Sequence, residues 1–210
     1  MTLKDKIKKT IATGLAAISL YMPMKASATD LDLGVRDIQG SDSAYTEVTA
    51  GYTLPESIEG FTFIDSFDDG SYFGKTSLTK DIGLGDKIKS TIIHADDIYS
   101  SIGLGMSRDY SSSLADLTVG FLPLWFDKEG DSLDQATLDY FVSVKDLPFG
   151  LDLTSFGEWI ISEGSAKFDY GEIMLSKKVG DITIGYNPAL IGDGDSTPDV
   201  EQRISIGYDF

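Results

Sequence analysis

Hydrophobic and polar residues alternate along most of the chain after Asp30, with a period of two residues. The segment 137–145 is a clear example, and the segments 115–121 and 181–187 repeat it. In the first, the apolar set is Leu138, Tyr140, Val142 and Val144, and the intervening set is Thr137, Asp139, Phe141, Ser143 and Lys145. Successive side chains of a strand point to opposite faces, so this pattern predicts strands with one apolar and one small or polar face.

Turn signals rich in Gly, Pro, Asp and Ser separate these segments at regular intervals. Many short strands with turns between them are typical of an all-β sandwich or barrel. We expect one domain of about twelve strands, with ten as the alternative because the first segment is weak. The expected strands are 31–38, 44–54, 59–67, 71–80, 86–94, 98–108, 114–125, 134–145, 150–161, 165–177, 180–188 and 201–210.

A few positions break the alternation. Pro123 lies inside an expected strand, where it predicts a bulge or an early end to pairing. The apolar phase switches within 167–177, which also predicts a bulge. Phe156 falls on the polar face of its strand, and Asp65 shares a face with phenylalanines.

The N-terminus has the three-part pattern of a secretory signal peptide. A lysine-rich start precedes a short apolar run at 11–20, and the small residues at 26–28 follow. The alternative, an anchoring helix, needs about twenty apolar residues, more than this run provides. We therefore expect a signal peptide at 1–28, cleavage after Ala28 and a mature domain at 29–210. No later segment has the hydropathy of a spanning helix.

The final segment carries the most specific signal. The chain given ends on Phe210, and counting back by twos gives Tyr208, Ile206 and Ile204. This pattern resembles the C-terminal signature of Gram-negative outer-membrane β-barrel proteins. The resemblance implies that barrel-assembly machinery binds this strand and that the same strand closes the barrel. The alternative is an ordinary strand of a soluble sandwich.

These observations together predict a closed antiparallel transmembrane β-barrel in the bacterial outer membrane. If Phe210 is periplasmic, the connections at 40–43, 68–70, 95–97, 127–133, 162–165 and 192–198 lie outside. Short turns at 55–58, 81–85, 109–113, 146–149 and 178–180 then lie in the periplasm. Aromatic residues at both strand ends predict two membrane girdles, with core aromatics of a sandwich as the alternative. They are Trp125 and Trp159 outside, and Tyr52, Phe149, Tyr208 and Phe210 inside.

Composition and charge narrow the function. The formal charge is -17, and the first 28 residues carry +4, so residues 29–210 carry -21. A chain this acidic repels nucleic-acid backbones and attracts cations. The absence of Cys excludes disulfides and thiolate metal sites. We expect no cofactor, and expected partners are the lipid bilayer and lipopolysaccharide.

The polar strand faces supply candidate pore-lining residues, with Lys87 and Lys145 as expected ionic partners. The candidates are Asp116, Asp139, Asp152, Glu158, Asp181, Arg203 and Asp209. A water-filled acidic lumen favours small cations or neutral polar solutes. The alternative is a closed lumen in which these charges pair with one another, as in a structural or surface-interaction barrel.

The length of the chain and its expected number of strands are also similar to those of small substrate-specific channels. The segments 61–65 (FTFID) and 72–74 (YFG) are faintly similar to the nucleoside-channel group. The oligosaccharide channels handle acidic sugars through a basic lumen, and this acidic chain departs from that pattern.

A catalytic site and a calcium site are the alternatives to a pore. His94, the single histidine, could serve an outer-membrane enzyme together with nearby Ser and Asp residues. The more ordinary interpretation is a loop histidine, and we expect no enzyme. Asp193, Asp195 and Asp199 offer oxygen ligands for calcium, but they lack the closing Glu of an EF-hand loop, so a solvated acidic loop is favoured.

Overall fold

The computed structural model describes residues 31–41, 43–95, 99–192 and 198–209. The expected signal peptide, Asp193, Asp195 and Phe210 lie outside these residues. Among the described residues, no helix has the length and hydropathy that a membrane span requires.

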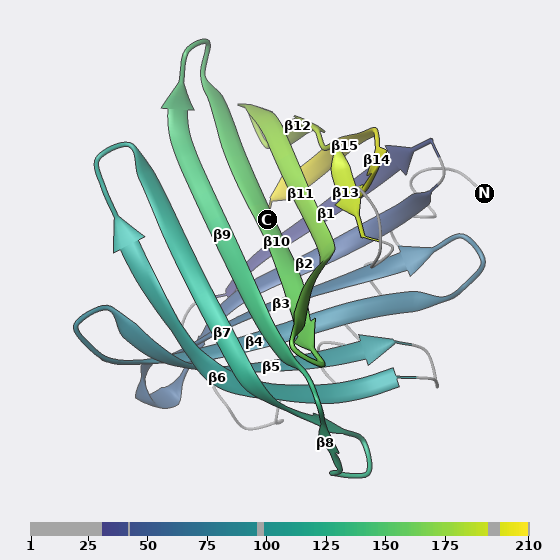
Figure 1. Cartoon of the computed structure of the whole chain (residues 1–210). Helices are drawn as coiled ribbons and strands as arrows, with labels where there is room; N and C mark the ends of the chain where they lie inside the picture. The colour runs from purple at the N-terminus through teal and green to yellow at the C-terminus, as the bar shows by residue number, and fades with distance from the viewer. Residues whose placement is uncertain (1–30, 42, 96–98, 193–197, 210) are drawn as a thin grey trace.

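Nearly all of the described chain is β-strand, joined by short turns (Figure 1). A single 3-10 turn, η1 (Pro55–Ser57), links β2 to β3. The strands are β1 (Leu31–Gly40), β2 (Ala44–Leu54), β3 (Ile58–Phe67), β4 (Tyr72–Gly83), β5 (Asp86–Ala95), β6 (Tyr99–Ser111), β7 (Ala115–Asp127), β8 (Ser132–Leu133), β9 (Ala136–Leu147), β10 (Leu151–Ser162), β11 (Ser165–Val179), β12 (Ile182–Tyr186), β13 (Ala189–Ile191), β14 (Asp199–Glu201) and β15 (Arg203–Asp209).

These strands close into a twelve-stranded antiparallel barrel, which confirms the predicted fold class. Consecutive strands pair from β1 to β7 and from β9 to β12, while β7 also pairs with β9 and β12 with β15. β15 pairs with β1 to complete the circle, for example at Val35 opposite Tyr208. Closure leaves no unpaired sheet edge, which is the condition for a sheet to span a hydrocarbon layer.

The last two expected strands are interrupted, which the sequence pattern does not predict. β12 ends at Tyr186 and β13 resumes at Ala189, while Gln202 separates β14 from β15. Pro188 has no N–H to donate to the ladder. The Asn187 side chain turns inward instead, where it is fully buried and bonds to Glu172 and Ser205. The short strand β8, which pairs with the end of β7, is a further departure.

A bulge in β7 corrects the expected position of Trp125. The register between β6 and β7 shifts at the segment that contains Pro123, where the bulge was predicted. One extra residue reverses the alternation beyond it. Trp125 therefore faces inward, is only 2% exposed, and packs over Gly103, rather than joining an outer girdle. The second predicted bulge is also confirmed, in β11 at Asp169 opposite Glu158 and Trp159.

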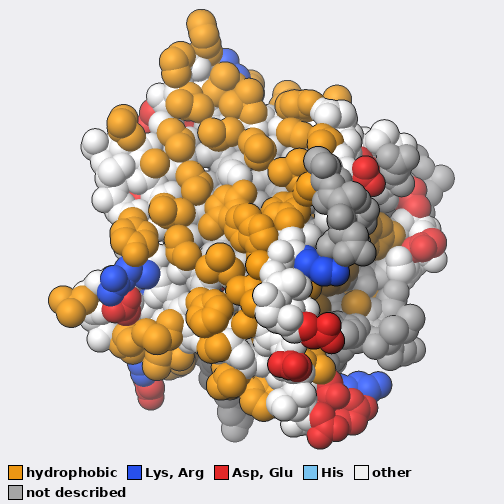
Figure 2. All heavy atoms as spheres, viewed as in Figure 1, with side chains coloured by type: hydrophobic (Ala, Val, Ile, Leu, Met, Phe, Trp, Pro, Cys, Tyr) orange, Lys and Arg blue, Asp and Glu red, His pale blue; other side chains and the backbone are white. Residues whose placement is uncertain are grey.

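The outward strand faces form an apolar surface. Exposed side chains such as Ile102, Phe121 and Ile206 follow the outward positions of their strands. Trp159 also points outward and packs against Tyr140 and Phe168. Figure 2 shows hydrophobic side chains spread over the visible face, with most charged side chains toward its margins. Such a surface matches hydrocarbon.

The connections alternate between the two ends of the barrel, as antiparallel order requires. The turns η1, 84–85, 112–114, 148–150 and 180–181 lie at one end, and the connection 128–135 lies at the other. The longest connection within the described residues therefore lies at the end opposite the C-terminus of β15, as predicted.

Adjacent residues of β9 offer a test of the two faces. We expect Val142→Lys, on the outward face, to lower the free energy of unfolding by as much as about 2–4 kcal/mol, because a lysine near the bilayer centre is costly. Ser143→Lys, on the inward face, is the matched control and should change stability little. Urea unfolding in lipid vesicles, followed by tryptophan fluorescence, measures both. Equal effects would contradict the assignment of faces.

The β7 bulge can be tested at Gly105. A Cβ there would lie 2.6 Å from the Leu122 Cα, so Gly105→Ala forces the two backbones apart. We expect a loss of about 1–3 kcal/mol, as in other overpacked sites. Gly51→Ala is the control, because a Cβ at Gly51 would have the Asp32 Cβ as its nearest neighbour, 3.8 Å away. The same unfolding measurement applies, and a Gly105→Ala barrel as stable as Gly51→Ala would argue against the close approach.

Candidate functional site

Polar and charged side chains converge inside the barrel, on the inward strand faces. Side chains alternate between the two faces of each strand. Once one residue is known to point inward, the residues two positions before and after it point inward as well. Lys75, Lys89 and Arg203 are such markers, since each bonds to a residue on a strand that is not its neighbour. We call the space that they enclose the lumen.

Two ion pairs cross the lumen. Lys75 on β4 donates to Glu158 on β10, with 2.5 Å between Nζ and Oε2. Five strand-to-strand steps separate β4 from β10 along the shorter way round, which is about 24 Å of wall. Lys89 on β5 bonds both carboxylate oxygens of Asp139 on β9, at 2.6 and 2.8 Å. Side chains thus bridge opposite walls and narrow the lumen.

A second group of charges is buried against the wall where the chain closes. We call it the Arg203 cluster, and it comprises Arg203, Glu201, Glu172, Tyr45 and Tyr170. Arg203 donates to Glu201 Oε2 at 2.6 Å and to the hydroxyls of Tyr45 and Tyr170 at 2.9 and 2.8 Å. Tyr170 in turn donates to Glu172 at 3.1 Å. These bonds tie together β2, β11, β14 and β15.

Arg36 extends this network along β1. Its guanidinium pairs with Glu47 at 2.6 Å, donates to the Met174 sulfur, and lies 3.9 Å from Glu172. Asp65 lies opposite Glu47 in the β2–β3 register, and one of its buried carboxylate oxygens has no hydrogen-bond partner. The carboxylates here therefore exceed what the two arginines neutralise.

Lys87 lies near the end of the lumen marked by η1. Its ammonium group pairs with Glu59 at 2.5 Å and with Asp109 at 2.9 Å, and neither carboxylate is among the candidate pore-lining residues. Lys145, the other expected partner, lies exposed near the end of β9.

The expected pore-lining residues fall into four groups. Asp139, Glu158 and Arg203 lie in the lumen and form the bonds described above. Asp116 and Asp152 lie on inward strand positions, and neither forms an ion pair within the described part of the chain. Asp181 lies exposed in the β11–β12 turn rather than in a strand, which corrects the expectation. Asp209 ends β15 opposite Gly34.

Sequence reasoning missed the cationic partners Lys75 and Lys89, and also Arg36, Glu47 and Glu172. All five occupy inward positions of their strands, so the alternation could have identified them as lumen residues. Their pairing follows from the barrel's order and curvature, which no local pattern records.

His94 lies on β5 opposite Gly74 and Ser100, one position out of phase with the inward residues Lys89 and Thr91. It therefore faces outward, while the Ser101 hydroxyl is buried on the inward side. These two side chains lie on opposite faces of the wall. Among the described residues, no group of three or more His, Asp and Glu side chains could hold a metal ion.

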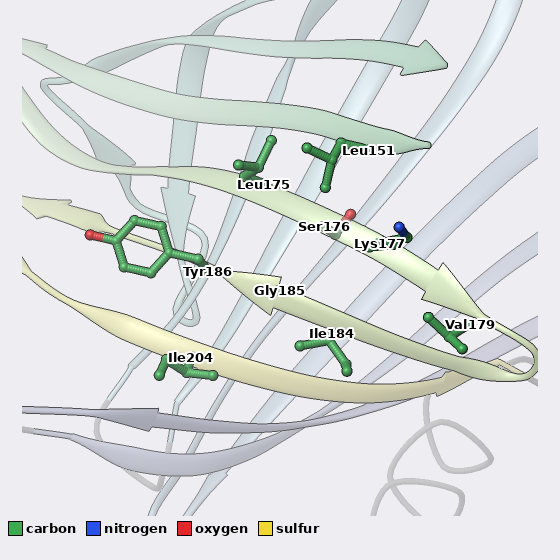
Figure 3. A pocket seen from close by; sticks show the side chains of 9 residues that line it. All are labelled: Leu151, Leu175, Ser176, Lys177, Val179, Ile184, Gly185, Tyr186 and Ile204. Carbon is green, nitrogen blue, oxygen red and sulfur yellow. The ribbon is translucent and has the colours of Figure 1, made fainter. Parts of the chain in front are cut away.

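A shallow groove of about 390 Å³ lies on the outer wall across β10, β11, β12 and β15 (Figure 3). Outward residues such as Leu175, Ile184 and Ile204 line it, and its lining is mostly apolar. This lining suits hydrocarbon, so the polar chemistry of the molecule is concentrated in the lumen.

The Arg203 cluster predicts a large effect of charge removal. Arg203→Met leaves buried Glu201 without its cation and Glu172 with Arg36 alone, and breaking a buried pair typically costs about 3–5 kcal/mol. Arg108→Met is the control, because Arg108 pairs with Asp86 in an exposed position and should matter little. Urea unfolding of both variants in vesicles is the measurement. A mild Arg203→Met phenotype would show that the cluster is dispensable.

Comparison with known proteins gives structural matches alone. No family model and no curated protein matches the sequence. The fold is similar to the NanC porin, with a TM-score of 0.57 and 10% identity over 86% of this chain and 99% of that one. It is also similar to the KdgM porin in complex with disordered oligogalacturonate, with a TM-score of 0.54 and 10% identity over 85% and 98%. The chain therefore has the fold of outer-membrane porins with a closed twelve-stranded barrel.

Proposed function

We propose that the chain forms a narrow passive channel in the bacterial outer membrane, with a preference for small cations and neutral polar solutes. The observation that carries this proposal is the charge balance of the lumen. Arg36, Arg203 and the three lysines at 75, 87 and 89 are each paired with carboxylates. Asp116 and Asp152 remain as additional inward acids. A negative lumen with low-dielectric walls concentrates cations.

Several features support the membrane placement. The outer surface is apolar, Trp159 and Tyr208 point outward, and the fold is that of porins. In this proposal residues 1–28 direct export and are removed, and assembly machinery binds the segment 203–210. The long connections then meet lipopolysaccharide outside. The proposed activity needs no catalytic residue.

A closed-lumen surface-interaction barrel is the second candidate. The observation that favours it is the burial of the Arg203 cluster, whose side chains fill the lumen beside the closing strands. A channel and a closed barrel differ in conductance, so one experiment separates them.

The test is single-channel recording of the refolded mature chain in a planar bilayer, with a salt gradient. We expect stable conductance steps and a reversal potential that indicates cation preference. Asp116→Asn with Asp152→Asn should weaken that preference. A barrel that inserts but never conducts would favour the closed-lumen candidate instead.

The Lys75–Glu158 bridge gives a sharper prediction. Lys75→Met removes a cation from this bridge across the lumen and leaves Glu158 unpaired, so conductance and cation preference should both increase. Lys80→Met on the same strand is the control, because Lys80 pairs with Glu56 in an exposed position near η1. The same recordings measure both variants. Unchanged conductance in Lys75→Met would mean that the bridge does not limit passage.

A further inference from the structure

Aromatic side chains form a row along the inward face of β3. Phe61, Phe63 and Phe67 share the parity of Asp65 on this strand. Phe63 lies opposite the lumen residue Lys75 and contacts Phe73, with 5.9 Å between ring centroids. Phe67 contacts Tyr45 of the Arg203 cluster at 5.3 Å. We call these three phenylalanines the β3 row.

The ring of Phe61 is 50% exposed although it faces the interior of the barrel. It lies opposite Gly51 on β2 and Ser77 on β4, so small residues leave its face uncovered. This ring face is open to a solute in the lumen, and aromatic side chains beside a few polar groups are typical of binding sites.

A second group of rings lies on the wall formed by β9, β10 and β11. Phe141 and Phe156 are directly opposite each other in the strand register, and Phe156 contacts Tyr170 at 6.0 Å. Phe141 is 44% exposed. The lumen therefore presents aromatic faces from two separate parts of its wall.

Polar groups lie beside these rings. Lys75 is the register partner of Phe63, and its bridge ends at Glu158, two residues from Phe156. The pair supplies hydrogen-bond donors and acceptors with no net charge. Flat apolar surfaces flanked by a neutral donor–acceptor pair suit a solute with apolar ring faces and hydroxyl groups at its rim.

We propose that neutral sugars are the solutes that this lumen binds, stacking on the β3 row while their hydroxyls bond to the Lys75–Glu158 pair. This inference rests on the proposed channel function and names its substrate class. Anionic sugars are disfavoured, because the inward carboxylates of Asp116 and Asp152 form no ion pair within the described part of the chain.

The experiment uses the refolded mature chain and the neutral trisaccharide maltotriose. Isothermal titration calorimetry in detergent measures binding whether or not the barrel conducts, and bilayer recordings measure block of the ion current. Sorbitol, an acyclic polyol, and galacturonic acid, an anionic sugar, are the comparison solutes. We expect maltotriose to bind and to block, and both comparison solutes to do so far more weakly.

Phe61→Ala should weaken binding about three- to tenfold, the loss that one aromatic stack supplies. Phe121→Ala is the matched control, since Phe121 is 46% exposed on the outward face. An equal effect of the two variants, or equal binding of sorbitol and maltotriose, would overturn the sugar assignment. Conductance without maltotriose binding would overturn the sugar inference alone. Absence of conductance with maltotriose bound would overturn the channel and leave the sugar site standing.

Discussion

Closure of the backbone hydrogen-bond ladder between β1 and β15 is the constraint on which the rest of the structure depends. A sheet in hydrocarbon cannot leave an edge unpaired, so the twelve strands must form a circle. Once the circle is closed, the alternation of side chains divides the molecule into a lipid face and a lumen face. Every residue discussed above takes its environment from that division.

The same closure concentrates charge inside the barrel. The lumen holds the ion pairs that join strands across it, and the Arg203 cluster is buried where the first and last strands meet. Paired charges recover part of their desolvation cost only when their hydrogen bonds are satisfied, and Arg203 meets this condition through Glu201, Tyr45 and Tyr170. The additional acids remain as the source of the lumen's negative potential.

Period-two alternation predicted the strands to within a few residues and the inward position of Asp139 and Glu158, and the C-terminal signature favoured a barrel over a sandwich. The sequence pattern also located both bulges, because Pro123 and the phase change near Phe168 are local signals. Trp125 was misplaced because the bulge reverses all later positions of its strand. The interruption between β12 and β13 was not predicted, because it involves a bond from the Asn187 side chain to Glu172, a residue that is distant in sequence. Lys75 and Glu158 are 83 residues apart in sequence, so only the circular order reveals their contact.

The bridge between Lys75 and Glu158 also has a consequence for the order of assembly. Its two strands are not neighbours, so the bridge can form only after β5 to β9 have folded into a curved wall between them. Hairpin contacts are local and can form early, whereas a contact of this span must wait for the slow, non-local part of folding. The bridge therefore forms when the barrel is nearly complete. It stabilises the closed barrel and does not direct the early steps of folding.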